Sequence, residues 1–248
     1  MEQLRIIIIG ATSSIAKHCA RHWVCKASNM LLVGRDEERL AITAEDLRAR
    51  GPQADIRTIT VDFLDGDGID SLVANYSSDG AIDIALVAHG HLPDQVAAQS
   101  TLTDCKNALM VNGVSPAIFM EALSKHMEPA GKGSLAIIGS VAGDRGRKSN
   151  YIYGSSKSLV DRYAQGLQHR LAGSGVHVCL IKPGPTLTAM TSHLLGTGMK
   201  LAPVEDVAIS IVRAIEERKA VIYTPGKWRL IMLIIKHLPR FIFNKLDI

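Results

Sequence analysis

The chain has 248 residues, a formal net charge of +4 and 47% hydrophobic residues. This length and apolar content fit one large α/β domain with an ample core. The modest charge is not interleaved with aromatic residues, which argues against nucleic-acid binding. No His, Cys and carboxylate cluster indicates a metal, so we expect no metal site and four reduced, partly buried thiols, those of Cys19, Cys25, Cys105 and Cys179.

The N-terminal segment predicts a buried strand followed by an anion-binding turn. Residues 6–9 are all isoleucine, a run too short to span a membrane and typical of a central parallel strand. The small residues 10–16 follow and then give way to a helical stretch. Unpaired N–H groups and the helix dipole face such a turn and attract anions. As a dinucleotide fingerprint the turn has one glycine, Gly10, with Ser14 and Ala16 at the other two glycine positions, so an ordinary βα turn is the alternative.

Apolar runs alternate with longer helical patterns along the chain. This alternation predicts βαβ units with right-handed crossovers and a parallel sheet. We therefore expect an α/β fold of the Rossmann type, a doubly wound parallel sheet of about seven strands with helices on both faces. The expected strands are 5–9, 30–33, 57–61, 82–88, 134–139, 176–182 and 220–223, and the expected helices are 14–27, 36–50, 67–76, 103–128, 151–172 and 205–218.

The chain shows no internal repeat, low-complexity tract or linker. We expect a single catalytic domain, residues 1–226, and a basic amphipathic tail, residues 227–248, that belongs to the same domain. The first strand begins almost at the N-terminus, which leaves no room for a signal peptide and predicts a cytoplasmic location.

Tyr153 and Lys157 are the most informative pair of residues. Four positions apart on a helix, they lie on the same face. The ammonium is expected to lower the pKa of the phenol toward working pH, where it can exchange a proton with a carbonyl or hydroxyl oxygen. Ser140 ends the apolar run 135–139 and is expected at the carboxyl edge of a strand, where open α/β sheets bind ligands. Tyr151 is a rival acid, but a serine stands four positions after it, so we expect it to line the pocket.

Together these residues resemble the short-chain dehydrogenase/reductase family in its compact single-domain form, from residue 5 to about residue 225. The family's catalytic serine, tyrosine and lysine match Ser140, Tyr153 and Lys157 in order and spacing. Its helix asparagine, which in relatives holds a water in a proton relay with the lysine, matches Asn112. The resemblance implies a nicotinamide-dependent oxidoreductase that reduces a ketone or oxidises a secondary alcohol.

The resemblance also implies a set of cofactor contacts. Asp62 matches the aspartate that meets the adenine, Pro183-Gly184 matches the segment against the nicotinamide, and Thr188 matches the residue that commonly bonds the carboxamide. The chain departs from the family in the altered glycine turn and after the fourth strand, where Asn-Ala-Gly is replaced by Ala-His-Gly. The full set of expected contacts is Gly10, Thr12, Ser13, Ser14, Ile15, Arg35, Asp62, Phe63, Ala88, His89, Gly90, Tyr153, Lys157, Pro183, Gly184, Thr186 and Thr188.

The end of the second strand bears on the choice of cofactor. NAD-specific sites place a carboxylate there that bonds the ribose 2′-hydroxyl and repels a 2′-phosphate. In this chain the corresponding residue is Gly34, and Arg35 follows it and can pair with a phosphate. We therefore favour NADP over NAD. Alternatively, a shift of one residue makes Asp36 the ribose ligand and leaves Arg35 to cap the next helix.

The resemblance assigns the roles in the reaction. Hydride passes between NAD(P)H and the carbonyl carbon while Tyr153 donates a proton to the oxygen. Lys157 bonds the nicotinamide ribose, Ser140 holds the substrate oxygen, and Asn112 supports the proton path from solvent. A nicotinamide-binding redox sensor without turnover is the alternative from another class, but such proteins usually lose the catalytic Tyr or Lys.

A basic loop bears on the substrate. Residues 143–150 carry Arg145, Arg147 and Lys148 beside the expected site. This cluster is consistent with an anionic substrate, phosphate especially. Solvated surface charge is the alternative.

The tail from residue 227 to residue 245 has five basic residues and no acidic one. Its longest apolar run, 230–235, is far too short for a membrane span. On a helical wheel the basic and apolar residues separate, as in a helix that lies in a membrane interface, and Pro239 must kink it. Alternatively, the apolar face packs on the core or on another subunit.

Loop and tail together resemble one branch of the family, the reductases of polyprenyl-phosphate-linked keto-pentoses such as decaprenylphosphoryl keto-ribose. Reduction of 3-oxoacyl-carrier protein and general ketone reduction are the alternatives. The expected partners are therefore a small-molecule or lipid-linked carbonyl substrate, the inner face of the membrane through the tail, and further copies of the chain in a dimer or tetramer.

Overall fold

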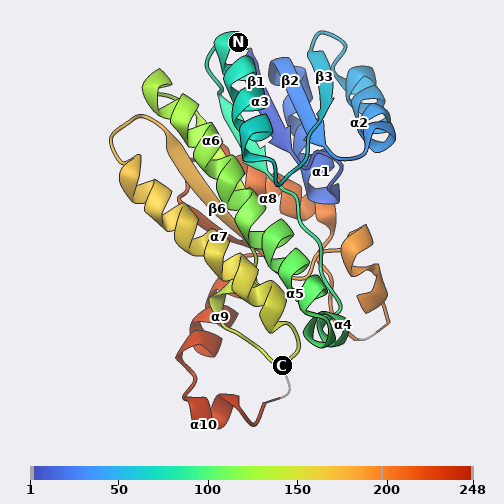
Figure 1. Ribbon diagram of the computed structural model, residues 1–248, viewed down its shortest axis with the longest axis vertical. Helices are drawn as coiled ribbons and strands as arrows, with labels where there is room; N and C mark the ends of the chain where they lie inside the picture. The colour runs from blue at the N-terminus through green and yellow to red at the C-terminus, as the bar shows by residue number, and fades with distance from the viewer. Residues whose placement is uncertain (1–2, 197, 247–248) are drawn as a thin grey trace.

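The computed structural model describes residues 3–196 and 198–246 of the chain. The strands are β1 Leu4–Ile9, β2 Ala27–Gly34, β3 Asp55–Thr60, β4 Ile84–Val87, β5 Ser134–Ile138, β6 His177–Pro183 and β7 Val221–Thr224. They form one parallel sheet in the order β3-β2-β1-β4-β5-β6-β7 (Figure 1). The chain builds outward from β1 to β3 and then returns to the other side of β1. The expected doubly wound sheet of seven strands is confirmed.

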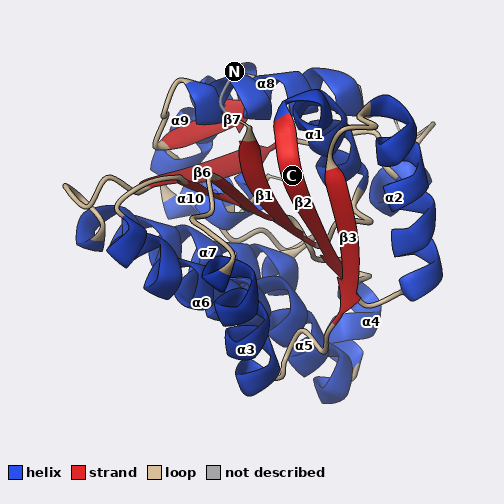
Figure 2. Ribbon diagram, turned by 90° about the horizontal axis from the view of Figure 1, so that it is seen from above, coloured by secondary structure: helices blue, strands red, loops and turns tan. Residues whose placement is uncertain are grey.

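Helices cover both faces of the sheet (Figure 2). The helices on one face are α1 Ser14–Trp23, α2 Glu37–Arg50 and α8 Val204–Glu216, and those on the other are α3 Gly66–Ser78, α6 Ser115–Ala130 and α7 Tyr151–Arg170. The four isoleucines of β1 are 0% exposed. Ile6 and Ile8 face the first group of helices, and Ile7 and Ile9 face the second. Because successive side chains point to opposite faces, a central parallel strand must be apolar at every position.

Several expected helix boundaries need correction. The expected helix 14–27 ends at Trp23, a 3-10 turn η1 Val24–Lys26 follows, and β2 begins at Ala27, ahead of the expected residue 30. Helix α4 Gln95–Ser100 was not expected. The expected single helix 103–128 is divided into α5 Leu102–Leu109, a π-helical turn η2 Met110–Val114, and α6.

Pro116 and Gly113 explain the π turn. Pro116 has no N–H group, so the carbonyl of Asn112 loses its usual helical donor, and the chain widens just before the proline. Gly113 lies against α7, where a Cβ would stand 3.1 Å from the carbonyl oxygen of Ser156. A larger residue would push the two helices apart, so the turn keeps Asn112 close to α7.

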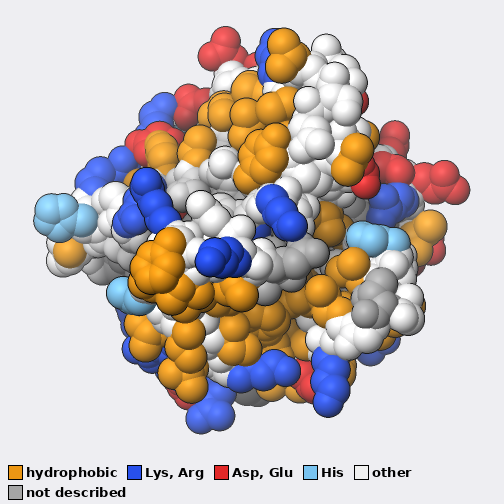
Figure 3. Space-filling model, turned by 90° about the horizontal axis from the view of Figure 1, so that it is seen from below, with side chains coloured by type: hydrophobic (Ala, Val, Ile, Leu, Met, Phe, Trp, Pro, Cys, Tyr) orange, Lys and Arg blue, Asp and Glu red, His pale blue; other side chains and the backbone are white. Residues whose placement is uncertain are grey.

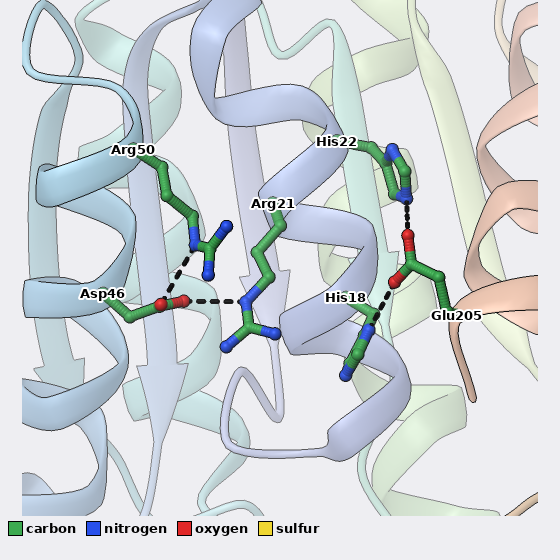
Figure 4. Close-up of polar contacts among 6 residues, drawn as sticks. All are labelled: His18, Arg21, His22, Asp46, Arg50 and Glu205. Carbon is green, nitrogen blue, oxygen red and sulfur yellow. Dashed lines mark hydrogen bonds and ion pairs between the residues drawn. The ribbon is translucent and has the colours of Figure 1, made fainter. Parts of the chain in front are cut away.

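Polar contacts hold α1 between its two neighbouring helices (Figure 4). His18 Nδ1 and His22 Nε2 lie 2.6 and 2.7 Å from the two carboxylate oxygens of Glu205, at the start of α8. The bonds from His18 and then His22 lower the pKa of Glu205. On the other side, Arg21 Nε donates to Asp46 of α2 at 2.8 Å. These contacts fix the helix whose N-terminus follows the Gly10 turn.

The tail folds as α9 Lys227–His237 and α10 Arg240–Phe243, at the lower end of the molecule in Figure 1. Helix α9 packs on the domain through Trp228, Ile231, Met232 and Ile235, which are partly or fully buried and recur at helical spacing. Helix α10 begins after Pro239, the residue at which the sequence predicts a kink. Among the described residues, no helix combines the length and apolar character that crossing a bilayer requires.

Candidate active site

The carboxyl ends of the parallel strands meet at one edge of the sheet, the lower edge in Figure 1. Each predicted site segment follows one of these strand ends. Gly10 follows β1, Arg35 follows β2, Asp62 lies after β3, Ser140 lies after β5, and Pro183 ends β6. The structure therefore brings together residues that are far apart in the sequence, at the edge where open α/β sheets bind ligands.

The turn after β1 has the geometry of a phosphate cradle. Gly10 has φ +77°, and a Cβ there would stand 2.7 Å from the backbone nitrogen of His89, so a side chain is excluded. Thr12 and Ser13 follow the glycine, and α1 begins at Ser14 and Ile15. The first amides of α1 lack intrahelical partners and face this turn. The residues present fit the pyrophosphate of a dinucleotide.

The end of β2 separates the two candidate ribose ligands. Asp36 is the N-cap of α2, and its carboxylate accepts the N–H of Arg39 at 3.0 Å. Arg35 is exposed, and its guanidinium carbon lies 5.8 Å from the centre of the Phe63 ring. Asp62 is also exposed, and one of its oxygens accepts the N–H of Leu64 at 2.9 Å. Of the two charged residues that directly follow β2, Asp36 is therefore engaged as the cap of α2, whereas Arg35 is exposed and does not cap the helix.

The histidine after β4 is part of a buried network. His89 Nε2 lies 2.9 Å from Ser115 Oγ, which donates to the carbonyl of Phe63 at 2.6 Å. The imidazole also packs edge-on against Phe63 and Phe119. Burial lowers the pKa of His89 to about 3, so the ring is neutral. The side chain that replaces the family's alanine therefore joins the β3 and β4 loops to α6, while Ala88 and Gly90 flank it on the strand edge.

The π turn aims Asn112 at the neighbouring loop. Asn112 is 0% exposed, and its Oδ1 accepts the N–H of His91 at 2.7 Å. Its Nδ2 has no partner among the described residues. A Cβ on Gly90 would stand 2.8 Å from Asn112 Oδ1 and 3.7 Å from Lys157 Nζ, so the asparagine and the lysine meet over this glycine. A buried donor without a partner in this position suits a bound water.

Ser140, Tyr153 and Lys157 come together where η3 Val141–Asp144 packs on the start of α7. Ser140 Oγ accepts the N–H of Ala142 at 3.1 Å, and the Ser140 hydroxyl is near enough to the Tyr153 phenol to lower its pKa. Lys157 is buried, and its Nζ donates to the carbonyl of Ile138 at 2.9 Å and lies 5.8 Å from the centre of the Tyr153 ring.

The protonation of the pair differs from the expectation. Desolvation raises the pKa of Tyr153 to about 12, although the Ser140 hydroxyl lowers it. The prediction that Lys157 lowers this pKa toward working pH is therefore wrong. The ammonium is directed at Ile138 rather than at the phenol oxygen. Burial lowers the pKa of Lys157 itself to about 8. A neutral phenol beside a largely protonated lysine can donate a proton at neutral pH.

The segment after β6 makes a contact that the sequence analysis missed. Trp228 of α9 lies directly on Gly184, where a Cβ would stand 2.0 Å from its Nε1. Thr186 Oγ1 donates to the carbonyl of Gly184 at 2.9 Å, and Thr188 bonds within the next turn, η4 Ala189–Leu194, through Thr191. The Pro-Gly segment at the site is thus covered by the tail. The available signal was a tryptophan at the start of an otherwise basic and aliphatic segment.

Arg145 has a different role from the one considered for the basic loop. Its Nη1 donates to three main-chain carbonyls at the end of α9, those of Ile235, Lys236 and Leu238, at 2.5, 3.1 and 2.7 Å. Its guanidinium carbon also lies 3.8 Å from the centre of the Phe243 ring. Carbonyls at a helix C-terminus lack intrahelical partners, and this side chain satisfies them. Arg145 therefore joins the loop after Ser140 to the tail and is not available to a substrate anion.

The chain is similar to known oxidoreductases over most of its length. The profile described as short chain dehydrogenase matches residues 5–197. An uncharacterized oxidoreductase of Mycobacterium tuberculosis is 33% identical over 244 residues, which cover 97% of this chain and 96% of the relative. An uncharacterized oxidoreductase of Streptomyces coelicolor is 29% identical and covers 97% of this chain and 95% of its own.

Solved structures show the same fold. A short-chain dehydrogenase from Sphingobium yanoikuyae in complex with NADPH superposes with a TM-score of 0.79 at 21% identity, over 96% of this chain and 97% of its own. A short-chain type dehydrogenase/reductase from Mycobacterium ulcerans gives a TM-score of 0.80 at 20% identity, over 99% of this chain and 100% of its own.

Replacing Gly184 with alanine is expected to displace Trp228 and loosen α9, because the new Cβ has no room. Overpacking of this kind costs about 1–3 kcal/mol, which a lower Tm and faster proteolysis of the tail would report. Gly226→Ala is the matched control, since a Cβ at that position meets nothing within 4 Å. Equal stability of the two variants would contradict the seating of Trp228 on the site.

Proposed function

The chain belongs to the short-chain dehydrogenase family and is an NAD(P)-dependent oxidoreductase, and from this premise we propose that it uses NADPH to reduce a ketone whose oxygen binds between Ser140 and Tyr153. The observation that carries this proposal is the grouping of Ser140, whose hydroxyl lowers the pKa of Tyr153, with the Tyr153 ring and the buried ammonium of Lys157, which lies 5.8 Å from the centre of that ring. The nicotinamide, when bound, supplies the hydride for the carbonyl carbon.

The chain's own residues handle the proton. Ser140 holds the carbonyl oxygen, and Tyr153 donates its proton to that oxygen, since its raised pKa keeps the phenol neutral until charge develops. Lys157 places a positive charge beside the phenolate that remains. Asn112 Nδ2, which is buried and without a described partner, holds a water through which the phenol regains its proton. A redox sensor would have no use for this arrangement, so turnover is the better-supported reading.

The preference for NADPH over NADH rests on Arg35 and Asp36. A carboxylate that selects NAD must be free to accept the ribose 2′-hydroxyl. Asp36 instead caps α2 through Arg39. Arg35 is exposed at the end of β2 and can form a charge-assisted pair with a 2′-phosphate.

We further propose that the ketone belongs to a lipid-linked keto-sugar that the enzyme meets at a membrane. The support is the surface around the site. Figure 3 views the molecule from the end that carries α9 and α10, and hydrophobic side chains spread across this face with Lys and Arg among and around them. Arg147 of the basic loop is half-buried, and its Nε has no partner among the described residues, which suits an anionic group near the site. Reduction of 3-oxoacyl-carrier protein and of general ketones remain the competing hypotheses.

The surface that would meet the membrane is the outer side of the tail, here called the tail surface and defined by Leu230, Leu233, Ile234 and Phe241. These side chains are 63%, 55%, 57% and 70% exposed. Those on α9 lie on the opposite side of the helix from Met232, which is buried in the domain. One side of α9 is therefore buried against the domain, and a second apolar stripe on the helix is exposed.

Charge favours an anionic lipid surface as the occupant of this stripe. The five basic residues of segment 227–245 are not balanced by any acidic one. An apolar stripe bordered by basic residues is the composition of a helix that lies in a membrane interface. Each basic residue near an anionic surface contributes about 1 kcal/mol, and salt screens this attraction.

Tyr153→Phe is expected to remove most hydride transfer, because no other phenol has the lysine one turn away, while NADPH binding stays nearly intact. Tyr151→Phe should be far milder, since Tyr151 is exposed. Steady-state NADPH oxidation with a panel of small ketones and fluorescence titration of the cofactor measure both effects. An active Tyr153→Phe enzyme would refute the proposed proton donor.

Arg35→Ala is expected to erase the preference for NADPH by weakening its binding by roughly 1.5–3 kcal/mol, the range for a lost charge-assisted bond, with NADH little changed. Asp36→Asn is the matched control. An asparagine can still cap α2, so the ratio of NADPH to NADH affinity should stay as in the wild type. Tighter binding of NADH than of NADPH by the wild-type protein would overturn the assignment.

Liposome co-sedimentation tests the tail surface. The full-length protein is expected to bind vesicles that contain phosphatidylserine more strongly than pure phosphatidylcholine vesicles, and high salt should reduce but not abolish binding, because apolar burial persists. Leu233→Ser/Ile234→Ser should weaken binding. The control Ile42→Ser/Ile209→Ser, which removes two residues that are 57% and 48% exposed on α2 and α8, should not. If both variants bound the vesicles equally, the proposal that the tail surface binds membranes would be refuted. If Leu233→Ser/Ile234→Ser instead lowered the mass of the oligomer in solution, the tail surface would be assigned to contact with a second copy of the chain.

A further inference from the structure

A buried group of charged and polar side chains lies behind the active site. Lys182 Nζ contacts Asp144 Oδ1 and lies 2.6 Å from Asp161 Oδ2. The Lys182, Asp144 and Asp161 side chains are 6%, 1% and 5% exposed. Tyr223 donates its hydroxyl to Asp144 Oδ2 at 2.8 Å. We call these four residues the buried ion cluster. Buried charges are rare and costly unless they are paired, so the cluster is a constraint that the fold has to satisfy.

Each charged member stands next to a segment that carries site residues. Asp144 ends η3, the turn that begins directly after Ser140. Asp161 lies one turn after Lys157 on α7. Lys182 immediately precedes Pro183 at the end of β6. A single ammonium thus joins the serine turn, the catalytic helix and the Pro-Gly segment.

The buried ion cluster also influences the pKa of Lys157. Asp161 raises the pKa of Lys157 and so opposes the effect of burial. Burial raises the pKa of Asp161 itself to about 6, which Lys182 opposes. Asp161 Oδ1 has no partner among the described residues, and a Cβ on Gly139 would stand 3.1 Å from it. One carboxylate oxygen of Asp161 therefore pairs with Lys182. The other has no hydrogen-bond partner among the described residues, and Asp161 acts on Lys157 by electrostatic attraction.

We propose that Lys182, Asp144 and Asp161 are positioning residues of this enzyme, which hold the three catalytic segments in register and keep the Lys157 ammonium charged beside the cofactor ribose. This role rests on the proposed function, since it assumes that Lys157 binds the cofactor. Without Lys182, two carboxylates would face each other in the interior. Without Asp161, Lys157 would lose its nearby anion.

The pH dependence of NADPH affinity can be assigned to Lys157 only if the titratable groups around Lys157 are known. Besides Asp161, they are Tyr153 on α7, His89 after β4, and, across the cluster, Asp144 and Lys182. His89 is neutral and Tyr153 protonated over the range where Lys157 titrates. Asp161 itself titrates near pH 6, so only a change well above pH 6 that depends on Asp161 reports Lys157.

NADPH affinity tests the electrostatic part without any substrate. Fluorescence titrations from pH 6 to 9.5 should show wild-type affinity falling as the pH rises through about 8, where Lys157 loses its proton. In Asp161→Asn the fall should come at a lower pH, by on the order of half to one unit, because the raising influence is gone. Lys125→Met, which breaks an exposed ion pair with Asp70 at 2.8 Å, is the control and should match the wild type.

Coupling between segments tests the mechanical part. Lys182→Met should weaken NADPH binding at pH 7 on the order of tenfold and lower turnover as well. Asp144→Asn should weaken NADPH binding less when it is added to Lys182→Met than when it is made in the wild type, because in Lys182→Met the Asp144 carboxylate has already lost its partner. Should Lys182→Met not fold, the comparison of Asp161→Asn with Lys125→Met still decides the proposal.

The outcomes separate this proposal from the proposed function. If Asp161→Asn lowers Tm but leaves the pH of the affinity change in place, or if the wild type shows no such change, the cluster is only structural and the proposal fails. The proposal would also fail if the effects of Lys182→Met and Asp144→Asn on NADPH binding were strictly additive in the double variant. An active Tyr153→Phe enzyme would refute the proton donor instead, while the NADPH titrations would still judge the cluster.

Discussion

The burial of the central sheet on both faces is the constraint on which the rest of the structure depends. Strand β1 can be covered on both sides only because all four isoleucines are apolar, and the helices that cover it are the crossovers between parallel strands. Parallel strands send their carboxyl ends to one edge. The residues after β1, β2, β4, β5 and β6 therefore lie along one edge of the sheet although they are spread over most of the chain.

Burial also sets the electrostatics of that site. Desolvation raises the pKa of Tyr153 and lowers those of Lys157 and His89, so one physical cause gives a neutral phenol, a readily titrated lysine and an uncharged imidazole. Because these side chains are buried, the charges that pair with them have to come from other groups of the protein. The pairing of Lys182 with Asp144 and Asp161 beside α7 places two carboxylates and an ammonium in the interior, where they neutralise one another in part.

The tail connects the site with the molecular surface. One side of α9 seats Trp228 on Gly184 and buries Met232, while Arg145 binds the end of the helix from the loop after Ser140. The other side presents exposed leucine and isoleucine residues among basic ones. A partner that bound this outer side would therefore act on a helix that touches both the serine loop and the Pro-Gly segment.

The sequence by itself determined the features that depend on local periodicity. Apolar runs and helical spacing predicted the seven parallel strands and placed Tyr153 and Lys157 one turn apart, and the order of motifs identified the family. Only the tertiary structure decided that Arg145 binds the tail rather than a substrate, and that Lys182 contacts two carboxylates. Arg145 and Ile235 are 90 positions apart, and Asp144 and Tyr223 are 79 apart. No helical or strand period spans such separations, because these contacts exist only after the crossovers have stacked the chain into layers.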